Sequence, residues 1–148
     1  NIENSINENL SFKINFLLAR TIIDNPRNSL ILSFSPITSS SFDLALSKKN
    51  IFNSNDSLSF FINQPNRIEY GSMNFKIQDL ADRYGNIHYK IKKINLEPTG
   101  RQLDIGLNYR HRLNDNAIFG IKSILSTDYK HYTSNLNHLI TATASVNF

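Results

Sequence analysis

The sequence predicts an all-β protein, an antiparallel up-and-down β-barrel of about eight strands, or as many as ten, that closes on the C-terminal strand ending at Phe148. Three observations carry this prediction. Apolar and polar residues alternate with a period of two through most of the chain, as expected of strands with one apolar face. Polar runs rich in Asn, Asp, Ser and Pro separate the alternating segments. The length of 148 residues suits one domain.

The N-terminal segment gives an ambiguous pattern. Ile2, Ile6 and Leu10 recur every four residues, as on one face of a helix, whereas strict alternation begins at Leu10. The sequence therefore predicts a linker or short helix over residues 1–9 and the barrel domain over residues 10–148.

The alternation gives about eight or nine strands, with turns between them. They cover residues 10–18, 30–35, 42–47, 58–63, 73–77, 87–92, 102–113, 117–125 and 138–148. The clearest is 102–113, in which Leu103, Ile105 and Leu107 alternate with polar residues. The pair Lys92-Lys93 interrupts the alternation and predicts a bulge or a bend.

Four charged residues fall on the polar faces of two neighbouring strands: Asp104, Arg110, Arg112 and Lys122. In a barrel they would point into the lumen, which for eight strands is just wide enough for side chains to fill. Opposite charges facing one another there would satisfy buried polar groups. We expect a polar network that plugs the barrel, with the lining of a narrow pore as the alternative.

Composition argues against several kinds of chemistry. The chain has no Cys, which excludes disulfides, thiolate metal sites and a cysteine nucleophile. Its four His show no zinc-binding spacing, and no paired-carboxylate, Ser/His/Asp or phosphate-loop constellation stands out. The net charge is +4, and the basic residues are scattered along the chain rather than clustered. We therefore expect no catalytic residue, no metal, no cofactor and no nucleic-acid partner.

The C-terminal strand resembles the closing strand of bacterial outer-membrane β-barrels, in which alternating apolar residues and a terminal aromatic form the assembly signal. The matching residues are Ile140, Ala142, Ala144, Val146 and Phe148. The resemblance implies that the apolar face meets outer-membrane lipid and that the barrel-assembly machinery is a partner. With Phe148 at the periplasmic rim, residues 114–116 become a short periplasmic turn and residues 127–137 an extracellular loop, an asymmetry typical of such barrels.

Two further segments point to one family. Residues 59–71, SFFINQPNRIEYG, resemble the SQPLRVESG segment of proteobacterial subtilisin-like serine peptidases, and residues 96–104, LEPTGRQLD, resemble the segment that follows it. Asn63 and Asn66 replace the usual Ser and Leu. In that family this region is a C-terminal autotransporter-like outer-membrane domain.

The resemblance implies an anchor or translocator-like domain for an N-terminal exported passenger, for example a peptidase. The family's catalytic motifs lie in the preceding domain, so no catalytic residue is carried over to this chain. The export signal would also lie upstream of Asn1. The alternative is a soluble β-sandwich or barrel that binds a ligand or partner, since alternation does not distinguish lipid from a protein core.

Overall fold

The computed structural model describes residues 2–24 and 30–146, which form antiparallel β-structure and one 3-10 turn, Tyr129–His131. The strands are β1 (Ile2–Asn7), β2 (Leu10–Thr21), β3 (Ile31–Phe34), β4 (Ile37–Lys49), β5 (Asp56–Tyr70), β6 (Ser72–Gln78), β7 (Tyr89–Asn95), β8 (Leu103–Asn114), β9 (Ala117–Thr127) and β10 (Asn137–Val146). The predicted all-β antiparallel class is therefore confirmed for this part of the chain.

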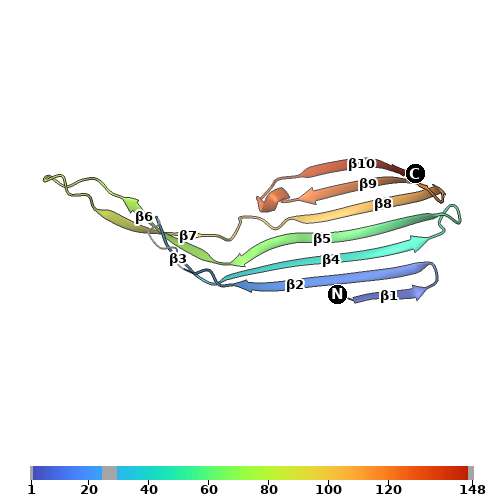
Figure 1. Ribbon diagram of the computed structural model, residues 1–148, viewed down its shortest axis with the longest axis horizontal. Helices are drawn as coiled ribbons and strands as arrows, with labels where there is room; N and C mark the ends of the chain where they lie inside the picture. Colours follow the sequence, from blue (N-terminus) through green and yellow to red (C-terminus); the bar gives the residue numbers. More distant parts are fainter. Residues whose placement is uncertain (1, 25–29, 147–148) are drawn as a thin grey trace. The chain divides into compact units, whose positions relative to one another are not determined.

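Seven strands lie side by side in one sheet, in the order β1-β2-β4-β5-β8-β9-β10 (Figure 1). The β9–β10 pairing is continuous, with Asn137 opposite Ser126 and Val146 opposite Ala117. Apart from β1, these strands contain 10–15 residues. For comparison, about 9–11 residues of a tilted strand suffice to cross a bilayer.

The other three strands form a separate sheet in the order β3-β6-β7. The chain also divides into two compact units, one within residues 1–17, 41–66 and 99–148 and the other within 18–40 and 67–98. The second unit contains this three-stranded sheet together with one end each of β2, β4 and β5. The sequence predicted these strands as part of a single barrel wall, and the structure corrects that. With only 4, 7 and 7 residues, β3, β6 and β7 are shorter than a spanning strand needs to be.

Residues 2–7 form β1 instead of the predicted linker or short helix. Ile2 lies opposite Ile14, and Asn4 lies opposite Phe12. A recurrence every four residues is also two periods of a strand, so the pattern fits both structures. An isolated helix of this length has marginal stability, whereas pairing with β2 satisfies the backbone hydrogen-bonding groups. The strand is therefore the more stable of the two structures.

The predicted bulge at Lys92-Lys93 is also absent, because β6 and β7 pair in one continuous register from Ser72 opposite Asn95 to Gln78 opposite Tyr89. Lys92 and Lys93 lie on opposite faces of an exposed hairpin, so both faces carry charge there. The alternation of apolar and polar residues is therefore lost although the pairing of the backbone is regular.

Short and long connections lie at opposite ends of the seven-stranded sheet. The short turns, residues 8–9, 50–55 and 115–116, all lie at one end (Figure 1). The connections that follow β2, β5 and β9 leave from the other end and cover residues 22–36, 71–102 and 128–136. The predicted contrast between a short turn at 114–116 and a long loop at 127–137 is therefore present, and it extends to the whole sheet.

The sheet is open over the described residues, because β1 and β10 are its two edges and are not paired with each other. The alternation of Ile140, Ala142, Ala144 and Val146 lies within β10, whereas Phe148 lies outside the described residues. β1 and β10 point in the same direction (Figure 1), as the first and last of seven antiparallel strands must.

No hydrophobic residue in the described part of the chain is buried, and the buried side chains are polar: Asp56, Gln64, Arg67, Gln102 and Ser126. A single-layer sheet has no second layer to cover either face, so it lacks the apolar core of a two-layer domain. Among the described residues, no helix is long and apolar enough to span a bilayer.

Candidate functional site

One face of the seven-stranded sheet is apolar across neighbouring strands. Residues that lie directly opposite in a sheet share a face. One row of this face joins Phe60, Leu107, Ser123 and Ile140, and the next row joins Leu58, Tyr109, Ile121 and Ala142. The side chains are open to the surroundings, with Leu107 49% and Ile140 65% exposed. Contiguous apolar surface of this kind marks contact with lipid or a partner.

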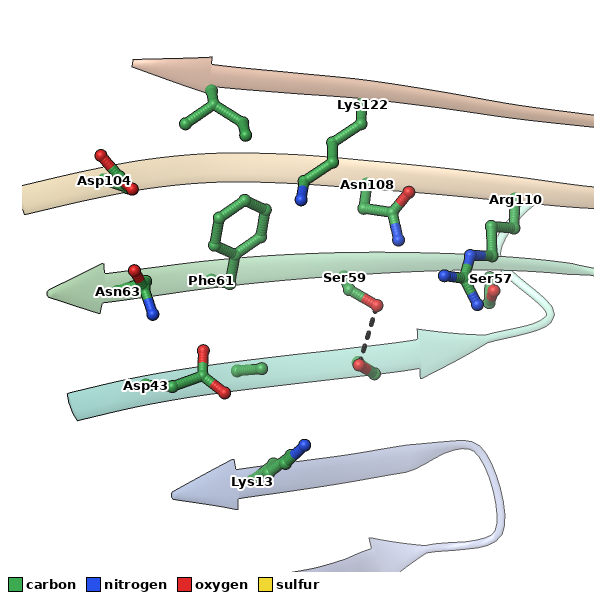
Figure 2. A pocket seen from close by; sticks show the side chains of 13 residues that line it. Lys13, Asp43, Ser57, Ser59, Phe61, Asn63, Asp104, Asn108, Arg110 and Lys122 are labelled. Atoms are coloured by element: carbon green, nitrogen blue, oxygen red, sulfur yellow. Dashed lines mark hydrogen bonds between the residues drawn. The ribbon is translucent and has the colours of Figure 1, made fainter. Parts of the chain in front are cut away.

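The opposite face is mainly polar and is hollowed into a concavity of about 650 Å³ (Figure 2). Labelled side chains that line it include Lys13, Asp43, Ser57, Ser59, Asn63, Asp104, Asn108, Arg110 and Lys122. Two short contacts hold neighbouring strands together: the hydroxyls of Ser47 and Ser59 lie 2.8 Å apart, and the Asn15 amide donates to Asp43 over 3.2 Å. The face therefore combines local hydrogen bonds with several charges.

The predicted lumen residues do lie on this polar face. Asp104, Arg110 and Lys122 line the concavity, and Arg112 lines an adjacent pocket with Arg110. Within the described residues, however, none of these four forms an ion pair with another, and Asp104 instead accepts a hydrogen bond from the Gln102 amide over 2.7 Å. Because Asp104 and Arg110 are six residues apart on β8, they are separated by roughly 20 Å. The predicted pairing of opposite charges is therefore not formed.

Phe61 is an aromatic residue on the polar face and lies over a glycine. It is directly opposite Gly106, where an added Cβ would come 2.3 Å from the Phe61 ring and 2.7 Å from the Ser123 carbonyl oxygen. The Lys122 ammonium lies 4.9 Å from the centre of the same ring, within cation–π range. The glycine thus allows a close contact that joins β5, β8 and β9.

A polar cluster lies at the end of the seven-stranded sheet from which the long connections leave. The backbone N–H of Gln102 donates to His131 Nδ1 over 3.0 Å, and the Gln102 side-chain oxygen accepts from the backbone N–H of Lys130 over 2.7 Å. Since His131 Nδ1 is an acceptor, the ring carries its proton on Nε2, which lies 3.2 Å from the Asn66 carbonyl oxygen. One histidine therefore ties β5 and the residue that precedes β8 to the β9–β10 loop.

Asp128 and Arg101 extend this cluster. Asp128 accepts from the backbone N–H groups of Arg101 and Ser134, over 3.1 and 2.9 Å, and the Arg101 guanidinium donates to the Gln64 side chain. The loop holds four non-glycine residues with positive φ: Asp128, Lys130, His131 and Ser134. Each such residue costs of order 1–3 kcal/mol, so the hydrogen bonds hold the loop in a conformation that it would not adopt alone.

The smaller unit has its own polar cluster, centred on Arg67. Its guanidinium pairs with Glu69 over 2.6 Å and with Glu97 over 3.5 Å, and it donates to the Pro98 carbonyl over 3.0 Å. The Ser40 hydroxyl donates to Glu69 over 2.6 Å. The cluster ties the ends of β4 and β5 to the segment after β7.

Two carboxylates organise the connection between β6 and β7. The hydrogen bond and ion pair with Lys90, at 2.6 Å, lower the pKa of Asp79. Hydrogen bonds from the Asn86 side chain and backbone lower the pKa of Asp82, with a further contribution from the backbone of Tyr84. Both groups therefore favour the charged form, which accepts these hydrogen bonds.

The described residues contain no group of His, Asp and Glu side chains placed to hold a metal ion. Ser123 Oγ and His138 Nε2 lie 3.1 Å apart, but on the face of the sheet that carries Leu107 and Ile140. A nucleophile–base pair requires a third group that orients the base, and no described hydrogen bond reaches the other ring nitrogen of His138. The pair satisfies two polar groups within an apolar surface.

Sequence reasoning missed the clusters around Gln102 and Arg67. Both consist mainly of residues from the two segments on which the family resemblance rests, 59–71 and 96–104. The β9–β10 loop adds residues to the cluster in the larger unit, and Ser40 adds one to the cluster in the smaller unit. The PNR and PTGRQ stretches had the polar and turn-forming residues that such clusters need, but nothing in the chain order indicated that they face each other.

Comparison with protein-family models, curated proteins and solved structures finds no match to this chain. The resemblance to the C-terminal domain of subtilisin-like peptidases therefore stays a prediction.

Proposed function

We propose that the seven-stranded sheet is part of the wall of a bacterial outer-membrane β-barrel that anchors an exported passenger. The observation that most strongly supports this proposal is the uncovered apolar face, on which large side chains such as Phe16, Leu107 and Ile140 are 49–66% exposed. The other face bears Lys13, Asp104 and other charged groups. A barrel in a membrane needs this arrangement, with apolar residues toward lipid and polar residues toward the lumen.

The distribution of the connections supports the same proposal. Outer-membrane barrels have short periplasmic turns and longer extracellular loops. By this rule the turns at residues 8–9, 50–55 and 115–116 face the periplasm, and the connections at 22–36, 71–102 and 128–136 face the outside. The β6–β7 hairpin, which would be long for a periplasmic turn, then belongs to an extracellular connection.

Closure of the barrel requires further strands. Since β1 and β10 run in the same direction, their direct pairing would be parallel, whereas bacterial barrels of this kind are antiparallel throughout. An odd number of additional strands between these two edges gives an antiparallel ring. One more strand gives the eight-stranded barrel, about the size that the sequence predicts.

The passenger, the partners and the location belong to the same proposal. The resemblance of residues 59–71 and 96–104 supports an anchor or translocator-like role for an N-terminal passenger, and the alternating β10 supports recognition by the barrel-assembly machinery. Outer-membrane lipid is the partner of the apolar face. We assign the barrel itself no catalytic role.

The chain contains no Cys, so single cysteine substitutions allow an unambiguous test. Leu107→Cys and Asn108→Cys place a nitroxide label on adjacent residues of β8 that lie on opposite faces. In lipid vesicles, the label at 107 should be accessible to oxygen and protected from a water-soluble nickel chelate. The label at 108 should show the reverse accessibility.

The main alternative is a soluble sandwich in which the apolar face packs against protein. Equal protection of the 107 label from oxygen and from nickel would indicate such a core. A monodisperse, folded chain in buffer without detergent would also contradict the barrel, as would failure to show heat-modifiable migration after reconstitution.

A further inference from the structure

Positive charge gathers at one end of the polar face of the seven-stranded sheet. Arg110 and Arg112 lie near the C-terminal end of β8, and Lys49 is the last residue of β4. The carboxylates that line the face, Asp43 and Asp104, lie toward the opposite strand ends (Figure 2). The face is therefore basic beside the short turns and acidic beside the long connections.

A pocket of about 380 Å³ lies at this basic end. Lys49, Ser57, Arg110 and Arg112 line it, together with residues of the 50–55 turn. Its volume lies within the range of small-molecule sites, about 300–1,000 Å³. Gly120 lies opposite Arg110 on β9, so no side chain stands directly opposite Arg110 on that strand.

Asp56 is the one carboxylate among the residues that line the pocket, and its oxygens are already engaged. It is 4% exposed, and it accepts hydrogen bonds of 2.7–3.1 Å from the backbone N–H groups of Ile51, Phe52 and Asn53 and one of 3.2 Å from the Tyr109 hydroxyl. Four donors leave this carboxylate little capacity to pair with the three cations.

The cations themselves have no such partners. Among the residues that the structure describes, no ion pair or side-chain hydrogen bond engages Lys49, Arg110 or Arg112. Three like charges around one pocket repel each other, and a bound anion relieves this repulsion. Guanidinium groups bind phosphate through two parallel hydrogen bonds, which makes paired arginines suited to it.

We propose that this pocket binds the phosphate group of a small soluble compound. The Arg110 and Arg112 guanidiniums hold the phosphate oxygens, Lys49 adds a third positive charge, and the Ser57 hydroxyl adds a donor. The pocket lies on the polar face, away from Leu107 and Ile140, so a soluble phosphate compound fits it better than a lipid headgroup. The proposal goes beyond the anchoring role and does not require the barrel to be closed.

The test is a titration of the full chain, folded in a neutral detergent, with inorganic pyrophosphate by isothermal calorimetry. We expect saturable binding that Arg110→Gln or Arg112→Gln weakens about tenfold or more, since a charge-assisted hydrogen bond contributes about 1.5–3 kcal/mol. Arg110→Lys, which keeps the charge but not the fork, should give an intermediate loss. The matched control is Arg83→Gln, which removes one positive charge in the smaller unit.

Absence of saturable binding by the unaltered chain, or an equal loss in Arg83→Gln, would overturn the proposal. Tighter binding to micelles containing phosphatidylglycerol than to pyrophosphate would also contradict it, by indicating a lipid headgroup. The arginine Nε–H resonances of the unaltered chain test the site even if a variant folds poorly. They should shift when pyrophosphate is added, and each Gln variant should lack one of them. The nitroxide accessibilities at 107 and 108 are independent of this result, so the two proposals can fail separately.

Discussion

In the larger unit, charged side chains line one face of a seven-stranded sheet, and Lys13, Arg110, Arg112 and Lys122 have no ion-pair partner among the described residues. In the smaller unit, Arg67 pairs with Glu69 and Glu97, Lys90 with Asp79, and His88 with Asp82. The strands differ in length as well. Those of the seven-stranded sheet other than β1 have 10–15 residues, and those of the three-stranded sheet have 4–7 residues.

This difference separates two ways of stabilising a sheet that has no second layer. The larger unit segregates apolar and polar residues, and its stability depends on what surrounds each face. The smaller unit has too few residues per strand for such faces, and specific polar contacts such as those of Arg67 hold its segments together. In the proposed barrel, segregated faces would suit strands between lipid and a polar lumen, and paired charges would suit a connection exposed to water.

The largest effect is expected when a charge enters the apolar face. Leu107→Lys should lower the free energy of unfolding in lipid by about 2–4 kcal/mol, as for a cation near the bilayer midplane. Asn108→Lys, one residue away on the polar face, should cost at most about 1 kcal/mol, from repulsion by the opposite Lys122. Urea unfolding in lipid vesicles measures both values, and equal costs would remove the distinction between the faces.

A smaller loss is expected from crowding the contact between Phe61 and Gly106. Gly106→Ala should cost about 1–3 kcal/mol, because the new methyl group meets the Phe61 ring and a backbone oxygen of β9. The same substitution in a Phe61→Ala background should cost less, since the ring is then gone. A double-mutant cycle by urea unfolding checks this, and strictly additive costs would contradict the contact.

In the smaller unit, Arg67→Met should cost about 1–3 kcal/mol, because the carboxylate of Glu69 and the Pro98 carbonyl lose their donor. The loss should be local. Hydrogen exchange should increase in residues 67–98, while the amides of β8 and β9 keep their protection. Lys93→Met is the matched control in β7, since it removes a charge without a described ion pair. A uniform increase across both units would show that they unfold together.

The smallest effect concerns acid. A carboxyl whose pKa is lowered by folding stabilises the folded form above the ordinary Asp pKa of about 3.9, and this contribution is lost as the pH falls through the lowered value. The pKa values of Asp79 and Asp82 are lowered, so the contacts of residues 79–88 should persist at neutral pH and weaken below about pH 4. Amide chemical shifts of Tyr84 and Asn86 report this change, and Asp82→Asn should remove the pH dependence while preserving part of the turn.

The alternation allowed most strands of the seven-stranded sheet to be predicted, most clearly β8 and β9. Residues 102–113 and 117–125 were expected as strands with Asp104, Arg110, Arg112 and Lys122 on the polar face, and β8 and β9 place them there. Three short alternations were predicted as part of the same barrel and belong to the second sheet instead. Neither the period nor the length of an alternation distinguishes the two cases, since 42–47 and 58–63 alternate over equally few residues and yet belong to strands of 13 and 15 residues in the seven-stranded sheet.

The polar clusters show what chain order leaves open. His131 lies in the segment expected as an extracellular loop, residues 127–137, yet it accepts a hydrogen bond from the backbone of Gln102, twenty-nine positions earlier. Four positive-φ residues in the loop could not be expected either, since Asp, Lys, His and Ser seldom adopt this conformation. Only the contacts of the folded chain stabilise it.

The sequence by itself determined the strands with two distinct faces, because side chains alternate at every residue whatever the partner strand. The tertiary structure decided which strands share a sheet and that β1 joins the seven-stranded one. Those outcomes depend on register and on contacts between distant segments, which must compete with one another for the same backbone hydrogen bonds.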